Sequence, residues 1–260
     1  VSRLAGGGPA AIKLIEAAVA RLEKLEPSPA TRLSYLYLIG EANAQLAELY
    51  GGPNASLGDR ERAGEYRARA LAIWADGHRE FPNDAGFHSR WLLASFNNER
   101  ERRAAWNDDV FKQWEAKFRA VVGAAGSDRR DVLLDIARFY FNVGTNNAAN
   151  SNSRVHAFEQ SLAYFRRIQA MQSEQTRPDD LRNIALPLKY LAGLTTIAPE
   201  KRRRYAEEAV AIDRERVKME PSSSISRMDL AFSLGALGDQ FAIAKNGEKA
   251  IVLYRESAAI

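Results

Sequence analysis

Apolar residues recur along the chain at intervals of three and four, the spacing that places side chains on one face of an α-helix. Two clear stripes consist of Ile12, Ile15, Val19 and Leu22 and of Ile136, Phe139, Tyr140 and Val143. No sustained alternation of apolar and polar residues, bounded by turn dipeptides, marks a β-strand. The pattern therefore predicts an all-α protein.

The points at which helices are interrupted recur at regular places. Short stops that contain proline follow charged helix ends at residues 26–27, 81–82, 177–178 and 220–221. Each stop is followed by Ser, Thr, Asp or Asn, which can cap the next helix. With a further boundary near residues 126–128, this spacing is typical of a repeat array, whose period is roughly 20–50 residues.

The last unit carries the most specific pattern. It reads Leu234-x-x-Leu237-Gly238-x-x-Phe241 and then Ala250-x-x-x-Tyr254-x-x-Ser257. This spacing resembles a tetratricopeptide repeat, which is an antiparallel helix pair. The small residues Gly238 and Ala250 would let the two backbones approach where the helices cross. In earlier units, Gly193 and Gly144 are expected at the position of Gly238.

Nearly the whole chain resembles a tetratricopeptide-repeat domain. The resemblance implies a single repeat domain folded as an α-α superhelix, with one leading helix and about five antiparallel helix pairs. We expect a flexible end at residues 1–8, the leading helix at 9–26 and pairs at about 31–81, 84–123, 127–173, 178–219 and 222–260. The 84–123 unit departs most from the pattern. Its Trp91, Trp106 and Trp114 form either a compact local core or a binding patch.

Two segments have a narrower resemblance. Residues 50–59, which lead into 65–73, and residues 227–239 with 254–260 resemble the repeat region after the catalytic domain of some bacterial serine/threonine protein kinases. In such proteins the repeats are regarded as sensor or partner-binding regions, and a kinase domain would lie in a longer parent protein. This chain itself lacks a Gly-rich phosphate loop after a strand, a His-Arg-Asp loop and an Asp-Phe-Gly motif.

Composition excludes much enzymology. The 260 residues include no cysteine, which removes disulfides, zinc ribbons, iron–sulfur clusters and thiol catalysis. The three histidines lack metal-ligand spacing. The net charge is +4, and acidic residues directly follow the basic run Lys201–Arg204, which favours a solvated helix face over a nucleic-acid site. We expect no catalytic site, no cofactor and no metal in this chain, and no nucleic-acid partner.

Membrane and targeting signals are also lacking in this sequence. No apolar run reaches the length of about 18 residues that a transmembrane helix needs, and residues 1–8 do not form a signal peptide. The chain ends at Ile260 on an apolar second-helix face. We therefore expect either more residues in a longer parent or a homodimer through this end. The compartment stays open: cytoplasmic, or extracytoplasmic if the chain follows a membrane span.

Function is inferred from the resemblance. First helices of the pairs would line a concave face that grips an extended peptide or a partner helix. Projecting the repeat register onto this face gives the binding candidates Phe96, Arg138, Phe141, Asn142, Thr145, Tyr190, Leu194, Phe232 and Asp239. We expect a non-catalytic interaction module, a sensor or regulatory region of a larger bacterial signalling protein. The alternative is a free-standing receptor for a small molecule or short peptide.

Overall fold

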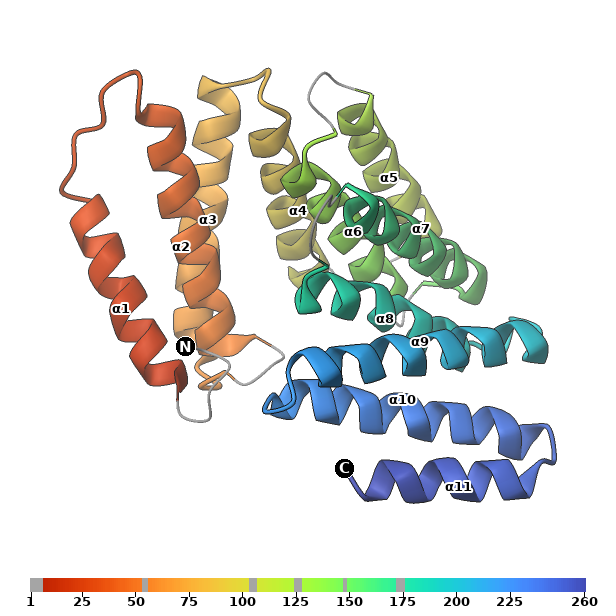
Figure 1. Cartoon of the computed structure of the whole chain (residues 1–260). Coiled ribbons are helices and arrows are strands. Elements are labelled where there is room, and N and C mark those ends of the chain that lie inside the picture. The colour runs from red at the N-terminus through yellow and green to blue at the C-terminus, as the bar shows by residue number, and fades with distance from the viewer. Residues whose placement is uncertain (1–6, 53–55, 103–106, 124–127, 147–148, 172–175) are drawn as a thin grey trace. The chain divides into compact units, whose positions relative to one another are not determined.

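The computed structural model describes residues 7–52, 56–102, 107–123, 128–146, 149–171 and 176–260. Within these ranges the chain forms eleven α-helices and no β-strand, which confirms the all-α prediction (Figure 1). None of these helices combines the length and the apolar character needed to cross a bilayer. Most of the end expected to be flexible, residues 1–8, lies outside the described residues, and the first helix begins at Gly7.

The chain divides into two compact units. Unit 1 comprises residues 1–103 and 116–132, and unit 2 comprises residues 104–115 and 133–260. The helices are α1 (Gly7–Leu22), α2 (Arg32–Gly51), α3 (Arg60–Glu80), α4 (Ala85–Arg102), α5 (Asp108–Val122), α6 (Arg130–Gly144), α7 (Ser151–Ala170), α8 (Pro178–Gly193), α9 (Pro199–Met219), α10 (Ser224–Ile243) and α11 (Gly247–Ala258).

Polar caps fix several helix starts. Asp59, Asn150, Ser223 and Asn246 precede α3, α7, α10 and α11, and each side chain accepts a hydrogen bond from a backbone N–H of the first turn. Such a bond satisfies one of the donors that have no partner inside the helix. Thr31 precedes α2 without a side-chain cap bond. The caps set where the helices begin, and hence the lengths of the connections between them.

The pair α10–α11 has a tight crossing at Gly238. A methyl group built on Gly238 would lie 2.6 Å from the ring of Tyr254, so only glycine allows this approach. One turn further along α11, the Ser257 hydroxyl donates to the carbonyl of Ala231 at 2.8 Å. The buried side chain of Ala250 lies on the same helix. The expected crossing of these two helices is thus present in atomic detail.

The pair α6–α7 repeats this arrangement. A methyl group on Gly144 would lie 2.7 Å from the ring of Phe158, and the Ser161 hydroxyl donates to the carbonyl of Ala137 at 3.0 Å. Ser161 on α7 therefore corresponds to Ser257 on α11. Gly193 does not follow the pattern, because no atom lies within 4 Å of a methyl group built there. Its neighbour Ala192 packs with Ala206 instead.

Ion pairs join the second helices of successive pairs in unit 2. Glu159 on α7 binds Lys201 on α9 at 2.7 Å, and Arg214 on α9 binds Glu256 on α11 at 2.7 Å. The partners are separated by 42 residues in both cases. First helices are joined similarly: Arg182 on α8 contacts Asp229 on α10 at 2.8 Å. Helices one pair apart therefore lie side by side within unit 2, as stacked repeats require.

Candidate functional site

Two of the expected binding residues are buried. Phe96 on α4 is 0 % exposed, and Leu194, just after α8, is 8 % exposed. Leu194 packs with Ile197 in the core of unit 2. Neither side chain offers a surface to a ligand, and we leave both out of the candidate site.

The other candidates lie on three first helices of unit 2. Arg138, Tyr190, Phe232 and Asp239 are exposed, whereas Phe141, Asn142 and Thr145 are partly buried. Asp239 accepts a hydrogen bond from the Tyr254 hydroxyl at 2.7 Å, and the Thr145 hydroxyl donates to the Asn142 carbonyl. The side chains of Asp239 and Thr145 therefore already form hydrogen bonds within the chain. Arg138, Phe141, Tyr190 and Phe232, together with Arg182 and Met228 on the same helices, are exposed or partly exposed, and we call them the first-helix surface.

Ring contacts connect α6 to α8 on this surface. The rings of Phe141 and Tyr190 meet edge to face, with centroids 5.5 Å apart, and Tyr190 stacks on the buried ring of Phe158 at 5.0 Å. Such pairs contribute about 0.5–1.5 kcal/mol beyond their buried area. Tyr190 is nevertheless 43 % exposed. It is therefore an aromatic side chain held in one orientation with a free face.

Phe232 extends the surface onto α10. It is 65 % exposed, and Met228, one turn earlier on the same helix, is exposed to a similar degree. The ammonium group of Lys189, on α8, lies 5.9 Å from the centre of the Phe232 ring, within the range of a cation–π contact. Neighbouring exposed apolar side chains of this size often mark an interaction site.

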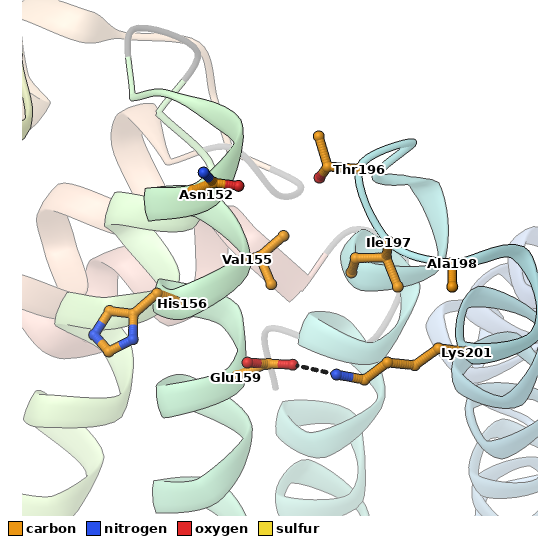
Figure 2. Close-up of a pocket in the computed structure, with 8 residues that line it drawn as sticks. All are labelled: Asn152, Val155, His156, Glu159, Thr196, Ile197, Ala198 and Lys201. Carbon is orange, nitrogen blue, oxygen red and sulfur yellow. Dashed lines mark hydrogen bonds and ion pairs between the residues drawn. The ribbon is translucent and has the colours of Figure 1, made fainter.

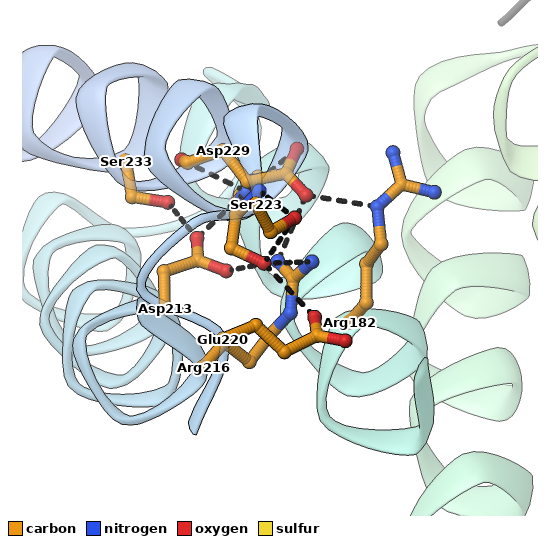
Figure 3. A network of polar contacts seen from close by, with 9 residues as sticks. Arg182, Asp213, Arg216, Glu220, Ser223, Asp229 and Ser233 are labelled. Atoms are coloured by element: carbon orange, nitrogen blue, oxygen red, sulfur yellow. Dashed lines mark hydrogen bonds and ion pairs between the residues drawn. The ribbon is translucent and has the colours of Figure 1, made fainter. Parts of the chain in front are cut away.

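A network of buried charges lies beneath this surface (Figure 3). Lys189 binds Asp213 at 2.7 Å, and Arg216 binds both Asp213 and Asp229 at 2.8 Å. The Ser233 hydroxyl donates to Asp213 at 2.6 Å, and Lys189 donates to the backbone carbonyl of Asp229 at 3.1 Å. These contacts link α8, α9 and α10 to one another.

The surroundings of Asp229 favour its ionised form. Burial raises the pKa of Asp229, but the hydrogen bond from Arg182, the charge of Lys189 and the hydrogen bond from Arg216 outweigh it, so this pKa lies below its ordinary value. Replacing such buried pairs with apolar residues is often neutral or stabilising. The network therefore joins the three helices, but its presence is not by itself evidence of added stability.

Arg182 and Met228 were not among the expected site residues. The Nε of Arg182 donates to Asp229 at 2.8 Å, and within the described chain its two Nη groups have no partner (Figure 3). Gly193 was expected at the position of Gly238, but in the pair α8–α9 the residue that packs against the second helix is Ala192. Anchoring the register on Ala192 places Arg182 level with Met228 on successive first helices. Both residues lie further from the crossing than the positions used for the expected site, so the repeat register did not point to them.

A hollow of about 370 Å³ lies elsewhere in unit 2, between α7 and the start of α9 (Figure 2). Its lining includes Asn152, His156, Glu159, Ile197 and Lys201. Lys201 is already paired with Glu159 at 2.7 Å, and His156 contacts Glu115 at 2.9 Å. The hydrogen bond to Glu159 raises the pKa of Lys201. The hollow is open, and its charged groups already have partners within the protein.

Unit 1 contains a stack of two histidines and a tryptophan. The rings of His78 and His88 have centroids 4.5 Å apart, and His78 stacks on Trp91 at 4.8 Å. Of the other tryptophans expected to cluster with Trp91, Trp114 is buried and belongs to unit 2, and Trp106 lies outside the described residues. Trp91 thus takes part in a local packing arrangement within unit 1.

Metal-binding groups are not assembled in the part of the chain that the structure describes, since it holds no cluster of three or more His, Asp or Glu suited to a metal ion. No family model matches this chain, and no curated protein or solved structure shows significant similarity to it. The first-helix surface and the hollow of unit 2 are therefore the observations from which function can be argued.

Proposed function

We propose that the chain is a non-catalytic module of tetratricopeptide type that binds a protein or peptide through its first-helix surface. The observation that carries this proposal is the set formed by the exposed side chains of Tyr190 and Phe232 and the partly exposed side chain of Arg182, each held in place by contacts from below. Aromatic residues and arginine are enriched among the residues that dominate binding energy at protein interfaces. A pre-oriented side chain also loses less conformational entropy when it binds.

Recurring contacts support the repeat assignment. The glycine–aromatic crossing and the serine–carbonyl bond occur in both α6–α7 and α10–α11. Ion pairs at a separation of 42 residues join successive second helices. We further propose that the module is a sensor or regulatory region of a larger bacterial signalling protein, such as a serine/threonine kinase. The support for this part is the resemblance of residues 50–59 with 65–73, and of residues 227–239 with 254–260, to the repeat region of such kinases.

Peptide selection tests the binding proposal directly. Peptides selected from a random library on the immobilised chain should bind the wild type, and Phe232→Ala and Tyr190→Ala should each weaken that binding by at least about tenfold. Arg182→Ala should weaken binding of peptides that carry an acidic group, because the two free Nη groups are lost. Fluorescence anisotropy with labelled peptides measures these changes.

The matched control is Leu14→Ala, which removes an equally exposed apolar side chain from α1 in unit 1. This variant should bind selected peptides as the wild type does. Failure to select any peptide that depends on Phe232 or Tyr190 would contradict the assignment of this surface.

The alternative is a receptor for a small molecule or short peptide, and the hollow between α7 and α9 supports it. Its volume falls within the range of small-ligand sites, roughly 300–1,000 Å³. A thermal-shift screen with small anions and amino acids tests this candidate. A compound that stabilises the wild type but not Lys201→Ala would favour it over the peptide-binding proposal.

A further inference from the structure

The last helix, α11, packs on the rest of unit 2 through one face. Ala250 is buried, the Ser257 hydroxyl donates to a carbonyl of α10, and Glu256 pairs with Arg214 of α9. Figure 1 shows α11 at the edge of unit 2, with α10 beside it. These contacts fix which side of α11 faces its own chain and which side faces outward.

The opposite face of α11 carries Glu248, Ile251, Val252 and Arg255, which we call the α11 outer face. These residues stand at positions i, i+3, i+4 and i+7, so they form one stripe along the helix. Ile251 is 51 % exposed and Val252 is 62 % exposed. Glu248 and Arg255 are exposed as well, and neither has an interaction partner among the described residues.

The two exposed β-branched residues indicate that another protein surface covers this stripe. Isoleucine and valine are poorer helix formers than alanine or leucine, because their branched side chains lose rotamer freedom in a helix. At the exposed centre of a short helix they reduce helix stability without burying apolar area. Burial against a partner would supply the hydrophobic stabilisation that these two residues lack in a single chain.

The charges of the stripe are complementary to those of a second copy. If two α11 helices lie antiparallel with a two-fold axis between Ile251 and Val252, Glu248 of each copy faces Arg255 of the other. The four apolar side chains then meet at the centre, and an ion pair forms at each end. A parallel arrangement would instead place like charges together. A face that matches itself under a two-fold axis is the requirement for a symmetric dimer.

We propose that the α11 outer face is a homodimer contact, in which two copies of this chain pair their last helices in antiparallel orientation. The face of one 12-residue helix is small. Contacts below about 1,200 Å² of total buried area belong to weak complexes. The dimer therefore forms at high protein concentration or high local concentration, and mass action controls its population.

Sedimentation equilibrium from roughly 10 μM to 1 mM tests the proposal, since this range brackets weak dissociation constants. The wild type should shift with concentration from 28.9 kDa toward twice that mass. Glu248→Arg and Arg255→Glu should each remain monomeric, because each variant places two pairs of like charges across the antiparallel contact.

The decisive sample is an equal mixture of these two variants. One variant carries arginine at both positions and the other carries glutamate at both, so an antiparallel heterodimer regains two ion pairs. The mixture should therefore dimerise at concentrations where each variant alone is monomeric. The double variant Glu248→Arg/Arg255→Glu should also dimerise with itself. If Glu248 and Arg255 only stabilised their own helix, mixing the two variants would not restore dimerisation.

Matched controls place the same charge changes on exposed positions of α9 that have no partner among the described residues. Glu200→Arg and Arg204→Glu should dimerise as the wild type does. Circular dichroism checks that every variant keeps its helix content. A wild type that stays at 28.9 kDa over the whole range, or a variant mixture that stays monomeric, would overturn the proposal.

Discussion

The buried ion network of α8, α9 and α10 makes a sharp prediction about Asp213. This carboxylate is 0 % exposed and accepts from Lys189 at 2.7 Å, from Arg216 at 2.8 Å and from Ser233 at 2.6 Å. Asp213→Ala would leave the two cations buried with Asp229 as their remaining carboxylate. An uncompensated charge in this environment is unfavourable, because the protein interior solvates it poorly.

The expected magnitude follows from burial. Removing one partner of a buried pair destabilises a protein by about 3–5 kcal/mol. Glu256→Ala removes one partner of the exposed pair with Arg214, at a similar distance of 2.7 Å. Because that pair is solvated, its loss should change the free energy of unfolding by less than about 1 kcal/mol. Comparing the stability losses of Asp213→Ala and Glu256→Ala therefore shows how much of the effect comes from burial and how much from losing an ion pair.

Urea unfolding followed by circular dichroism measures both variants, and urea leaves the charges unscreened. Hydrogen exchange of α8–α10 assigns the loss to this region. The double variant Lys189→Met/Asp213→Leu removes one cation and one carboxylate together, so it should be more stable than Asp213→Ala by about 1–3 kcal/mol. A loss below 1 kcal/mol for Asp213→Ala, equal to that of Glu256→Ala, would refute the reasoning.

Two further predictions concern glycine packing and pH. Gly238→Ala should destabilise the protein by about 1–3 kcal/mol, because the added methyl group would lie 2.6 Å from the ring of Tyr254. On the same helix, the methyl group of Gly235→Ala meets nothing within 4 Å, so this variant should be more stable than the wild type by about 0.5–1 kcal/mol. Thermal unfolding distinguishes the two variants, and equal effects would contradict the crossing geometry. Burial lowers the pKa of His78 and of His88 below 6.5, and for His88 the charge of His78 adds to the effect. Because the unfolded state binds protons at a higher pH than the folded state, the stability that the two neutral histidines contribute is fully present above pH 6.5. It is lost as the pH falls through their pKa values in the folded protein. His78→Phe should flatten the acidic side of the melting-temperature profile, and an unchanged profile would refute this assignment.

The helices and the Gly238 crossing could be predicted because both depend on local sequence. A period of 3.6 residues identifies a helix, and glycine followed by a spaced aromatic residue identifies a close crossing. The register of the preceding pair could not be predicted in the same way. The connection between α8 and α9 differs in length from that between α10 and α11, which moves the crossing from the expected Gly193 to Ala192.

Burial was harder to predict than secondary structure. Phe96 and Phe232 are the same residue type on first helices, yet one is 0 % and the other 65 % exposed. Hydrophobicity alone cannot separate them, because the exposure of each depends on what packs against its helix. Lys189 is the opposite case: lysine is almost always exposed, and its burial here depends on carboxylates more than 20 residues away in the sequence.

The buried network and the first-helix surface are physically continuous. The Lys189 ammonium group binds Asp213 and also lies near the ring of Phe232. Asp229 accepts a hydrogen bond from the Nε of Arg182 and so orients that side chain. Buried charges rarely stabilise a fold better than apolar side chains of similar volume would. Their presence beneath this surface is explained if they hold Phe232 and Arg182 at fixed positions, since rigid support under the contacting side chains is what a binding site requires. The contacts that join α8 and α10 thus also pre-orient the residues proposed to meet a ligand.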